Sequence, residues 1–106
     1  MNGRMPTMIQ AGFYSATRNY LEAIKAAGTD DPDKVMAQMK ATTWDDPVFG
    51  KGSIRADGRK MHNAYLVEVK KPSESKGPYD YEKVIATIPA EQAFRPLNQG
   101  ECPLVK

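Results

Sequence analysis

The sequence has 106 residues, of which 41% are apolar and 26% are charged, and its formal net charge is +2 at pH 7. These values are typical of one small globular domain or of part of a larger one, and they exclude a collagen, a coiled coil and a wholly disordered chain. Because basic and acidic residues are interspersed, the charge indicates neither nucleic acid nor an anionic membrane as a partner.

A first helix is predicted over residues 8–27. Its apolar and weakly polar residues recur at spacings of three and four, which places them on one face that we expect to be buried. These residues are Phe13, Thr17, Tyr20, Leu21, Ile24 and Ala27. Arg18, Glu22 and Lys25 fall on the opposite side, as a solvated face requires. Gly28 suits the left-handed residue that closes a helix.

A second helix is predicted to begin at Pro32, a residue well suited to the first helical position. Asp31 can accept hydrogen bonds from the free amides of the first turn, and Asp33 favours the positive end of the helix dipole. A short apolar stripe follows, made of Val35, Met36 and Met39. Because only a few residues join the two helices, we expect them to pack nearly antiparallel.

The remaining half of the chain is predicted to be mostly extended. Residues 44–52 have the composition of a loop with two aromatic side chains that need cover, and residues 53–55 form a short strand before a turn at residues 57–58. Apolar alternation predicts strands at 63–71 and 81–88, joined as a long-looped hairpin. One helical turn is expected at 89–94, followed by an irregular tail. The predicted fold class is α/β, with two N-terminal helices packed with a small, mostly antiparallel set of strands.

No group of residues indicates catalysis or metal binding. His62 has no second ligand at metal spacing and is interpreted as a surface histidine beside a strand. Cys102 is interpreted as a bystander thiol or one paired outside this chain. The acidic pairs at 30–31 and 45–46 precede prolines and are interpreted as caps of helices or turns. Residues 50–53 (GKGS) lack the helix that must follow a phosphate-binding loop. We therefore expect a non-enzyme with no catalytic residue, metal or cofactor.

The start of the first helix is the best candidate for a binding site. Residues 8–16 place an amide side chain, two aromatic rings and a hydroxyl around free helix amides, which attract a carboxylate, while aromatic walls suit an apolar ligand body. The same pattern allows Phe13 and Tyr14 to be core residues, so both interpretations stay open.

Several stretches together resemble the C-terminal part of the substrate-binding proteins of branched-chain amino acid ABC transporters, the leucine/isoleucine/valine-binding protein family. The first stretches are residues 5–16 (MPTMIQAGFYSA), 20–23 and 26–31. The later ones are residues 54–59 (IRADGR), 65–72 (YLVEVKKP), 94–97 and 102–106. Proteins of this family have two α/β lobes, a hinge of crossing strands and a ligand cleft between the lobes. The resemblance implies a partial fold of this kind, corresponding to about the last quarter of such a protein.

The resemblance also implies how the chain is divided and where its ligand wall lies. Residues 1–58 would supply the helical pair and short strand of one lobe, and residues 59–106 the hinge strands, the hairpin and the tail. The family's cleft wall, carried over residue by residue, points to Ile9, Gln10, Phe13 and Tyr14. Most of the family's contacts to the charged ends of an amino acid have no counterpart in this sequence.

The implied function is that of a solute-binding component, taking branched-chain amino acids or related amides or aromatic acids. Its implied partners are that small solute and an ABC permease, and its implied location is the periplasm, although residues 1–6 lack the apolar stretch of a signal peptide. No apolar run approaches the ~20 residues of a membrane span. The alternative is a small self-associating interaction or structural protein that binds no ligand. In either case we expect a homodimer or higher oligomer, since strand faces and edges would otherwise lie open.

Overall fold

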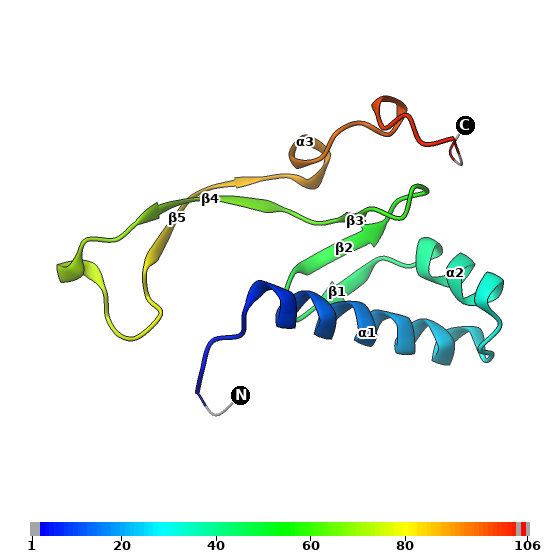
Figure 1. Cartoon of the computed structure of the whole chain (residues 1–106), viewed down its shortest axis with the longest axis horizontal. Helices are drawn as coiled ribbons and strands as arrows, with labels where there is room; N and C mark the ends of the chain where they lie inside the picture. The colour runs from blue at the N-terminus through cyan, green and yellow to red at the C-terminus, as the bar shows by residue number, and fades with distance from the viewer. Residues whose placement is uncertain (1–2, 104, 106) are drawn as a thin grey trace.

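The computed structural model describes residues 3–103 and 105 (Figure 1). Its elements in chain order are α1 (Met8–Ala27), α2 (Pro32–Ala41), β1 (Trp44–Asp46), β2 (Gly50–Ile54), β3 (Lys60–Met61), β4 (Ala64–Val69), β5 (Glu82–Ile88) and α3 (Ala90–Ala93). Short 3-10 turns lie at Pro72–Glu74 and Leu97–Gln99. The two long helices and the sheet β1-β2-β3 lie together, and the β4–β5 ribbon extends away from them (Figure 1). The predicted α/β class is confirmed.

Local caps fix both ends of α1. Thr7 Oγ1 accepts a hydrogen bond from Gln10 N (3.3 Å), and Gln10 Oε1 accepts one from Thr7 N (3.0 Å), which is a complete capping box. At the other end Gly28 adopts φ 67° and donates from its amide to Ile24 O (2.9 Å). The left-handed backbone at this residue favours glycine, as predicted.

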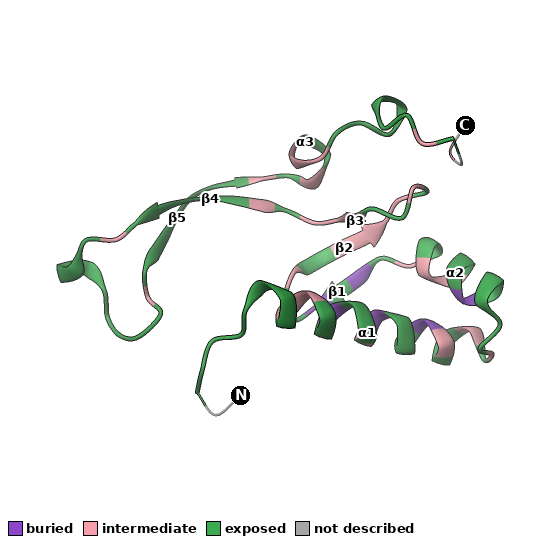
Figure 2. Ribbon diagram, viewed as in Figure 1, coloured by how far each residue is buried: buried purple, intermediate pink, exposed green. Residues whose placement is uncertain are grey.

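The face of α1 that packs on the rest of the chain differs from the predicted one. Ser15, Asn19 and Ala23 are buried, whereas Phe13 is 75% exposed. The prediction of a buried face was therefore wrong for Phe13, Thr17, Tyr20 and Leu21. It was right for Ile24 and Ala27, which pack partly buried against the core. Small side chains spaced four residues apart allow close approach to the strands, and the bulky apolar residues lie on the exposed side of the helix. Figure 2 shows the buried positions of α1 as short purple stretches between exposed ones.

The second helix begins as predicted and supplies part of the core. Asp31 Oδ1 accepts from Lys34 N (3.1 Å), and Pro32 is the first helical residue. Val35 is buried, and Met39 packs partly buried, but Met36 is exposed. In Figure 1, α2 turns back beside the C-terminal half of α1. The predicted apolar stripe of this helix is therefore only partly a core stripe.

Residues 44–54 form a β-hairpin, so the loop predicted over residues 44–52 was wrong. β1 and β2 pair antiparallel with Trp44 opposite Gly52 and Asp46 opposite Gly50. The sequence here lacks apolar alternation, and polar contacts close the turn instead: Asp46 Oδ1 accepts from Val48 N (2.7 Å) and Phe49 N (3.2 Å). The predicted short strand at 53–55 is the end of β2, which continues antiparallel to β3.

The predicted long-looped hairpin is the β4–β5 ribbon. Its strands pair antiparallel from Ala64 opposite Ile88 to Val69 opposite Glu82, with an irregularity between Leu66 and Val67. Apolar side chains are exposed along the ribbon, six of them in the strands and one, Tyr81, just before β5. The six are Tyr65, Leu66, Val67, Val69, Val84 and Ile85. Such a two-stranded ribbon is marginally stable in water unless another surface covers it.

The core of the described residues is small. Only Ala23, Val35 and Trp44 are buried apolar residues among them, and Trp44 Nε1 has no hydrogen-bond acceptor there. The Cα radius of gyration is 17.0 Å, against about 13 Å for a compact domain of this length. The chain is flat and extended, and Figure 2 shows most of its ribbon exposed.

Two glycine substitutions test the packing of β2 on β3. A Cβ at Gly52 would lie 2.5 Å from Met61 O, whereas a Cβ at Gly12 in α1 meets nothing within 4 Å. We expect Gly52→Ala to lower the free energy of unfolding by about 1–3 kcal/mol because the strands must move apart. Gly12→Ala should raise it by about 0.5–1 kcal/mol, since alanine costs less backbone entropy in a helix. Urea denaturation measures both, and equal effects of the two variants would contradict the strand pairing.

Candidate functional site

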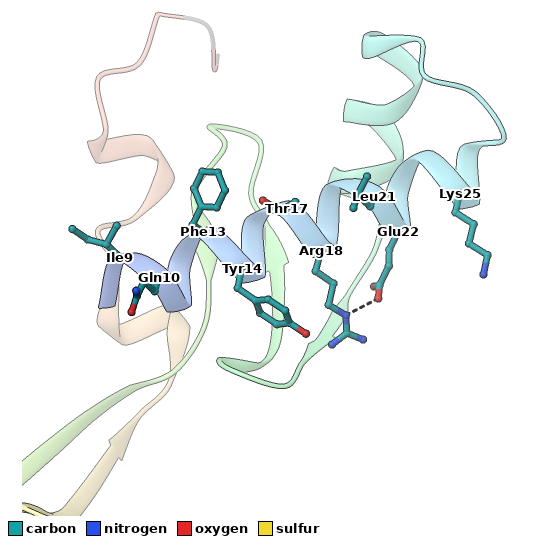
Figure 3. A pocket seen from close by; sticks show the side chains of 9 residues that line it. All are labelled: Ile9, Gln10, Phe13, Tyr14, Thr17, Arg18, Leu21, Glu22 and Lys25. Atoms are coloured by element: carbon teal, nitrogen blue, oxygen red, sulfur yellow. Dashed lines mark hydrogen bonds and ion pairs between the residues drawn. The ribbon is translucent and has the colours of Figure 1, made fainter. Parts of the chain in front are cut away.

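The four residues predicted to bind a ligand lie together on the N-terminal half of α1. Ile9 and Phe13 are 77% and 75% exposed, and Tyr14 is exposed as well. They form one end of a shallow open hollow along the helix, whose lining residues are Ile9, Gln10, Phe13, Tyr14, Thr17, Arg18, Leu21, Glu22 and Lys25. Figure 3 shows Phe13 and Tyr14 projecting from different sides of the helix. All of these lining residues belong to α1, so the hollow has a single wall and is open on its other side.

Gln10 already has a structural role at this site. Its side-chain carbonyl accepts from Thr7 N, and its backbone N–H is held by Thr7 Oγ1. The amide of Ala11 donates to Thr7 O (3.0 Å). The capping box therefore occupies helix amides that the sequence left available for a carboxylate. The Gln10 side-chain NH2 remains as a donor toward the hollow.

A buried polar cluster on the other face of α1 was not predicted from the sequence. Asp46 at the end of β1 is 3% exposed, and its Oδ2 accepts hydrogen bonds from Ser15 Oγ and from Lys60 Nζ, the latter at 3.0 Å. Lys60 Nζ also donates to Ser15 Oγ. Together with the Val48 and Phe49 amides on Oδ1, the carboxylate receives donors from α1, β3 and its own turn. We call Ser15, Asp46 and Lys60 the carboxylate clamp.

The clamp holds Asp46 in its ionised form. Burial is the largest single influence and would raise the pKa of Asp46, but the hydrogen bonds from Ser15, Lys60, Val48 and Phe49 together outweigh it. The pKa of this carboxyl therefore lies well below its usual range. Ser15 is buried, and its hydroxyl serves as a hydrogen-bond donor to the Asp46 carboxylate. The arrangement orients α1 on the strands.

Only the local part of this cluster had a sequence signal. The acidic pair before Pro47 indicated a turn cap, which Asp46 is, and Asp31 caps α2 as predicted. Ser15 and Lys60 lie far from Asp46 in the sequence, and neither carries a periodicity or spacing that links it to the carboxylate. The clamp is a tertiary feature.

An aromatic stack lies next to the clamp and contains the single histidine. The His62 ring is 5.1 Å from the ring of Phe49 and 5.4 Å from that of Phe94, measured between centroids. Its Nδ1 lies 2.8 Å from Asn63 O. Lys60 Nζ sits 4.6 Å from the centroid of Phe49, which joins stack and clamp. His62 is half-buried between two rings rather than at the surface, so it serves as a packing residue there.

The described residues contain no cluster suited to a metal ion and no helix suited to span a membrane. No group of three or more His, Cys, Asp or Glu side chains there is arranged to hold a metal ion. The helices described lack the length and apolar character needed to cross a membrane. Cys102 is half-buried and has no disulfide partner among the described residues.

The comparisons with known proteins agree with the fold just described. The sequence model of the periplasmic binding protein family matches residues 1–78. The chain belongs to that family. Among curated proteins, no sequence matches the chain.

Two solved structures extend the similarity over almost the whole chain. A periplasmic binding protein from Burkholderia mallei is 54% identical, with a TM-score of 0.90 over 97% of this chain. A branched chain amino acid ABC transporter periplasmic ligand-binding protein from Burkholderia xenovorans is 48% identical, with a TM-score of 0.90 over 98% of this chain. This chain spans only 27% and 28% of the lengths of those proteins. The expectation of about one quarter of a longer family member agrees with these shares.

Replacing the buried acceptor tests the carboxylate clamp. Asp46→Asn removes the charge that Lys60 and Ser15 share, which leaves a partly buried ammonium without its counter-ion. Because Lys60 keeps some contact with solvent, we expect a loss of about 1–3 kcal/mol in the free energy of unfolding. The adjacent Asp45→Asn changes an exposed carboxylate by the same atoms and should stay within about 0.5 kcal/mol of the original chain. Chemical denaturation at pH 7 measures both.

The same variant should change the acid dependence of stability. Since the folded pKa of Asp46 is lowered, the unfolded chain binds the proton first as the pH falls, so stability is lost below about pH 4. In Asp46→Asn this part of the loss is absent, and the stability difference between pH 7 and pH 3 should shrink. An unchanged difference would rule out an ionised, clamped Asp46.

Proposed function

We propose that this chain is the part of an ABC-transporter solute-binding protein that supplies one wall of the ligand cleft. The observation that supports this most strongly is the similarity to the Burkholderia xenovorans ligand-binding protein, at 48% identity and a TM-score of 0.90 over 98% of the chain. The proposed solutes are branched-chain amino acids or related amides or aromatic acids. The proposed partners are this solute and an ABC permease, in the periplasm, and the role is non-enzymatic.

The exposed stripe on α1 suits the apolar part of such a solute. Ile9, Phe13 and Tyr14 stand free on the helix surface, where they can contact an alkyl or aromatic side chain. Ligand sites of this kind are mostly apolar, with a few polar groups that fix orientation. The capping box already uses the Gln10 amide at the helix start, and we propose that most donors for an amino acid carboxylate come from other parts of a longer protein.

We propose the same division of the chain as the family resemblance implies. Residues 1–58 belong to one lobe, and residues 59–106 contain the hinge strands, the hairpin and the tail. β3 pairs with β2 across this boundary, and the aromatic stack joins Phe49 to Phe94 over it. The two parts are therefore connected by packing as well as by the chain, as a segment that leads into a hinge would need to be.

A titration followed by NMR tests the wall. A micromolar ligand is held by about 8 kcal/mol, and one wall without carboxylate donors should keep well under half of that. We expect leucine, phenylalanine and phenylacetate to shift the amide signals of residues 9–14 only at concentrations above about 1 mM, without measurable heat in calorimetry. Phe13→Ala should remove these shifts. Tyr20→Ala should not, because Tyr20 is exposed on α1 outside the hollow.

The outcomes of this titration are distinct. Micromolar binding by the 106-residue chain would contradict the one-wall assignment, since every residue that lines the hollow belongs to α1. Shifts confined to another part of the chain would contradict the choice of Ile9, Gln10, Phe13 and Tyr14.

The second candidate is a self-associating protein without a ligand, and the β4–β5 ribbon favours it. Six apolar side chains are exposed in the two strands, with Tyr81 just before β5, and few soluble monomers leave such a surface uncovered. Burial of this surface against a second copy is favourable at roughly 25 cal/mol per Å². We expect a homodimer or higher oligomer by light scattering at about 100 μM, and Leu66→Glu should shift it toward monomer. A monomer mass for the original chain would contradict association.

A further inference from the structure

The β2–β3 turn and the segment after α3 enclose a small hollow with a marked excess of positive charge. It has a volume of about 430 Å³, and its charged lining groups are Arg55, Asp57, Arg59 and Arg95. Three guanidinium groups thus face one carboxylate. Phe94 and the backbone near Gly100 complete the lining. The hollow lies apart from the α1 stripe and shares no lining residue with it.

Arg55 and Asp57 build the rigid floor of this hollow. Arg55 Nε and Nη2 donate to the two oxygens of Asp57, at 3.0 and 2.7 Å, and Arg55 Nη1 donates to Arg95 O at 2.8 Å. This two-pronged ion pair neutralises both partners, and the separate bond from Arg55 Nη1 to Arg95 O ties the turn to the segment after α3. Gly58 closes the turn with φ 81° and donates to Arg55 O (2.8 Å). Asp57 is therefore already engaged and leaves the other two arginines uncompensated.

Arg59 and Arg95 carry the excess charge. The Arg59 guanidinium lies 5.5 Å from the centroid of Phe94 and makes no side-chain hydrogen bond or ion pair within the described residues. Arg95 Nη1 makes one long hydrogen bond to Gln99 O (3.3 Å), and no carboxylate among the described residues pairs with it. Lys40 Nζ, bound to Ala56 O at 2.9 Å, places another cation beside the β2–β3 turn, outside the lining of the hollow. A pre-oriented guanidinium held on a ring face loses little freedom when it binds an anion.

We propose that this hollow binds a small polyvalent oxyanion, one that carries phosphate or several carboxylate groups. Planar guanidinium groups donate paired hydrogen bonds to such oxygens, and the concave lining favours a small ion over a flat surface. The anion would neutralise Arg59 and Arg95 and fasten the segment after α3 to the β2–β3 turn. This site is independent of the proposed transport role.

Titration at constant ionic strength tests the site in the 106-residue chain. Inorganic phosphate and tricarballylate are added at pH 7 against sodium chloride, and amide shifts of residues 55–59 and 93–100 are followed. We expect saturable shifts in these segments for at least one of the two anions. Saturation by phosphate alone assigns a phosphate-bearing ligand, and saturation by tricarballylate alone assigns a polycarboxylate.

Variants that each remove one positive charge distinguish a specific anion-binding site from non-specific electrostatic attraction. Arg59→Gln and Arg95→Gln should each weaken the saturable binding at least about fivefold. Arg4→Gln removes the same charge from an exposed residue outside the hollow and should leave binding unchanged. Shifts that do not saturate, or that weaken equally in Arg4→Gln, would overturn the proposal. So would the absence of shifts with both anions, or unchanged binding in Arg59→Gln and Arg95→Gln.

Discussion

The hydrogen bonds to one buried carboxylate decide how this chain presents its surfaces. Asp46 collects donors from α1, from β3 and from its own turn, and its burial makes each of them costly to lose. Because Ser15 must face Asp46, the rotation of α1 about its axis is fixed. The apolar stripe that carries Ile9 and Phe13 then points away from the strands. With only three buried apolar residues described, this polar contact carries an unusual share of the tertiary specificity.

The exposed apolar surfaces occur in a chain that matches only part of the length of its relatives. The chain belongs to the periplasmic binding protein family, and it spans just over a quarter of the two solved family structures while matching their fold at a TM-score of 0.90. Such a piece keeps its local caps and strand pairings, which need only neighbouring residues. Its helix stripe and its β4–β5 ribbon expose apolar surfaces of a kind that monomeric soluble proteins rarely leave uncovered. The open stripe on α1 accompanies a core of only three buried apolar residues among those described.

The sequence predicted elements well where the signal is local. Pro32 with its preceding aspartate, Gly28 after the first helix and the alternation around Tyr65 each act within a few residues, and those elements are confirmed. The predicted orientation of α1 was wrong because the hydrogen bond from Ser15 to Asp46 turns the other face of the helix toward the strands. The apolar periodicity of the sequence does not reveal this contact. The 44–54 hairpin was missed because its strands lack apolar alternation and its turn is closed by hydrogen bonds from the Val48 and Phe49 amides to Asp46. The ligand wall was inferred from the side chains of residues 8–16 together with the family resemblance, and it stays a prediction.

Thiol labelling of α1 tests the central claim, that the clamp turns its apolar stripe outward. In a Cys102→Ser background at about 1 μM, where association is weak, Phe13→Cys and Ala23→Cys are compared with the same variants unfolded in urea. We expect the thiol at position 13 to react nearly as fast as in the unfolded chain. The thiol at position 23 should react at least about tenfold more slowly than in the unfolded chain. A protected thiol at position 13 with a reactive one at position 23 would contradict it.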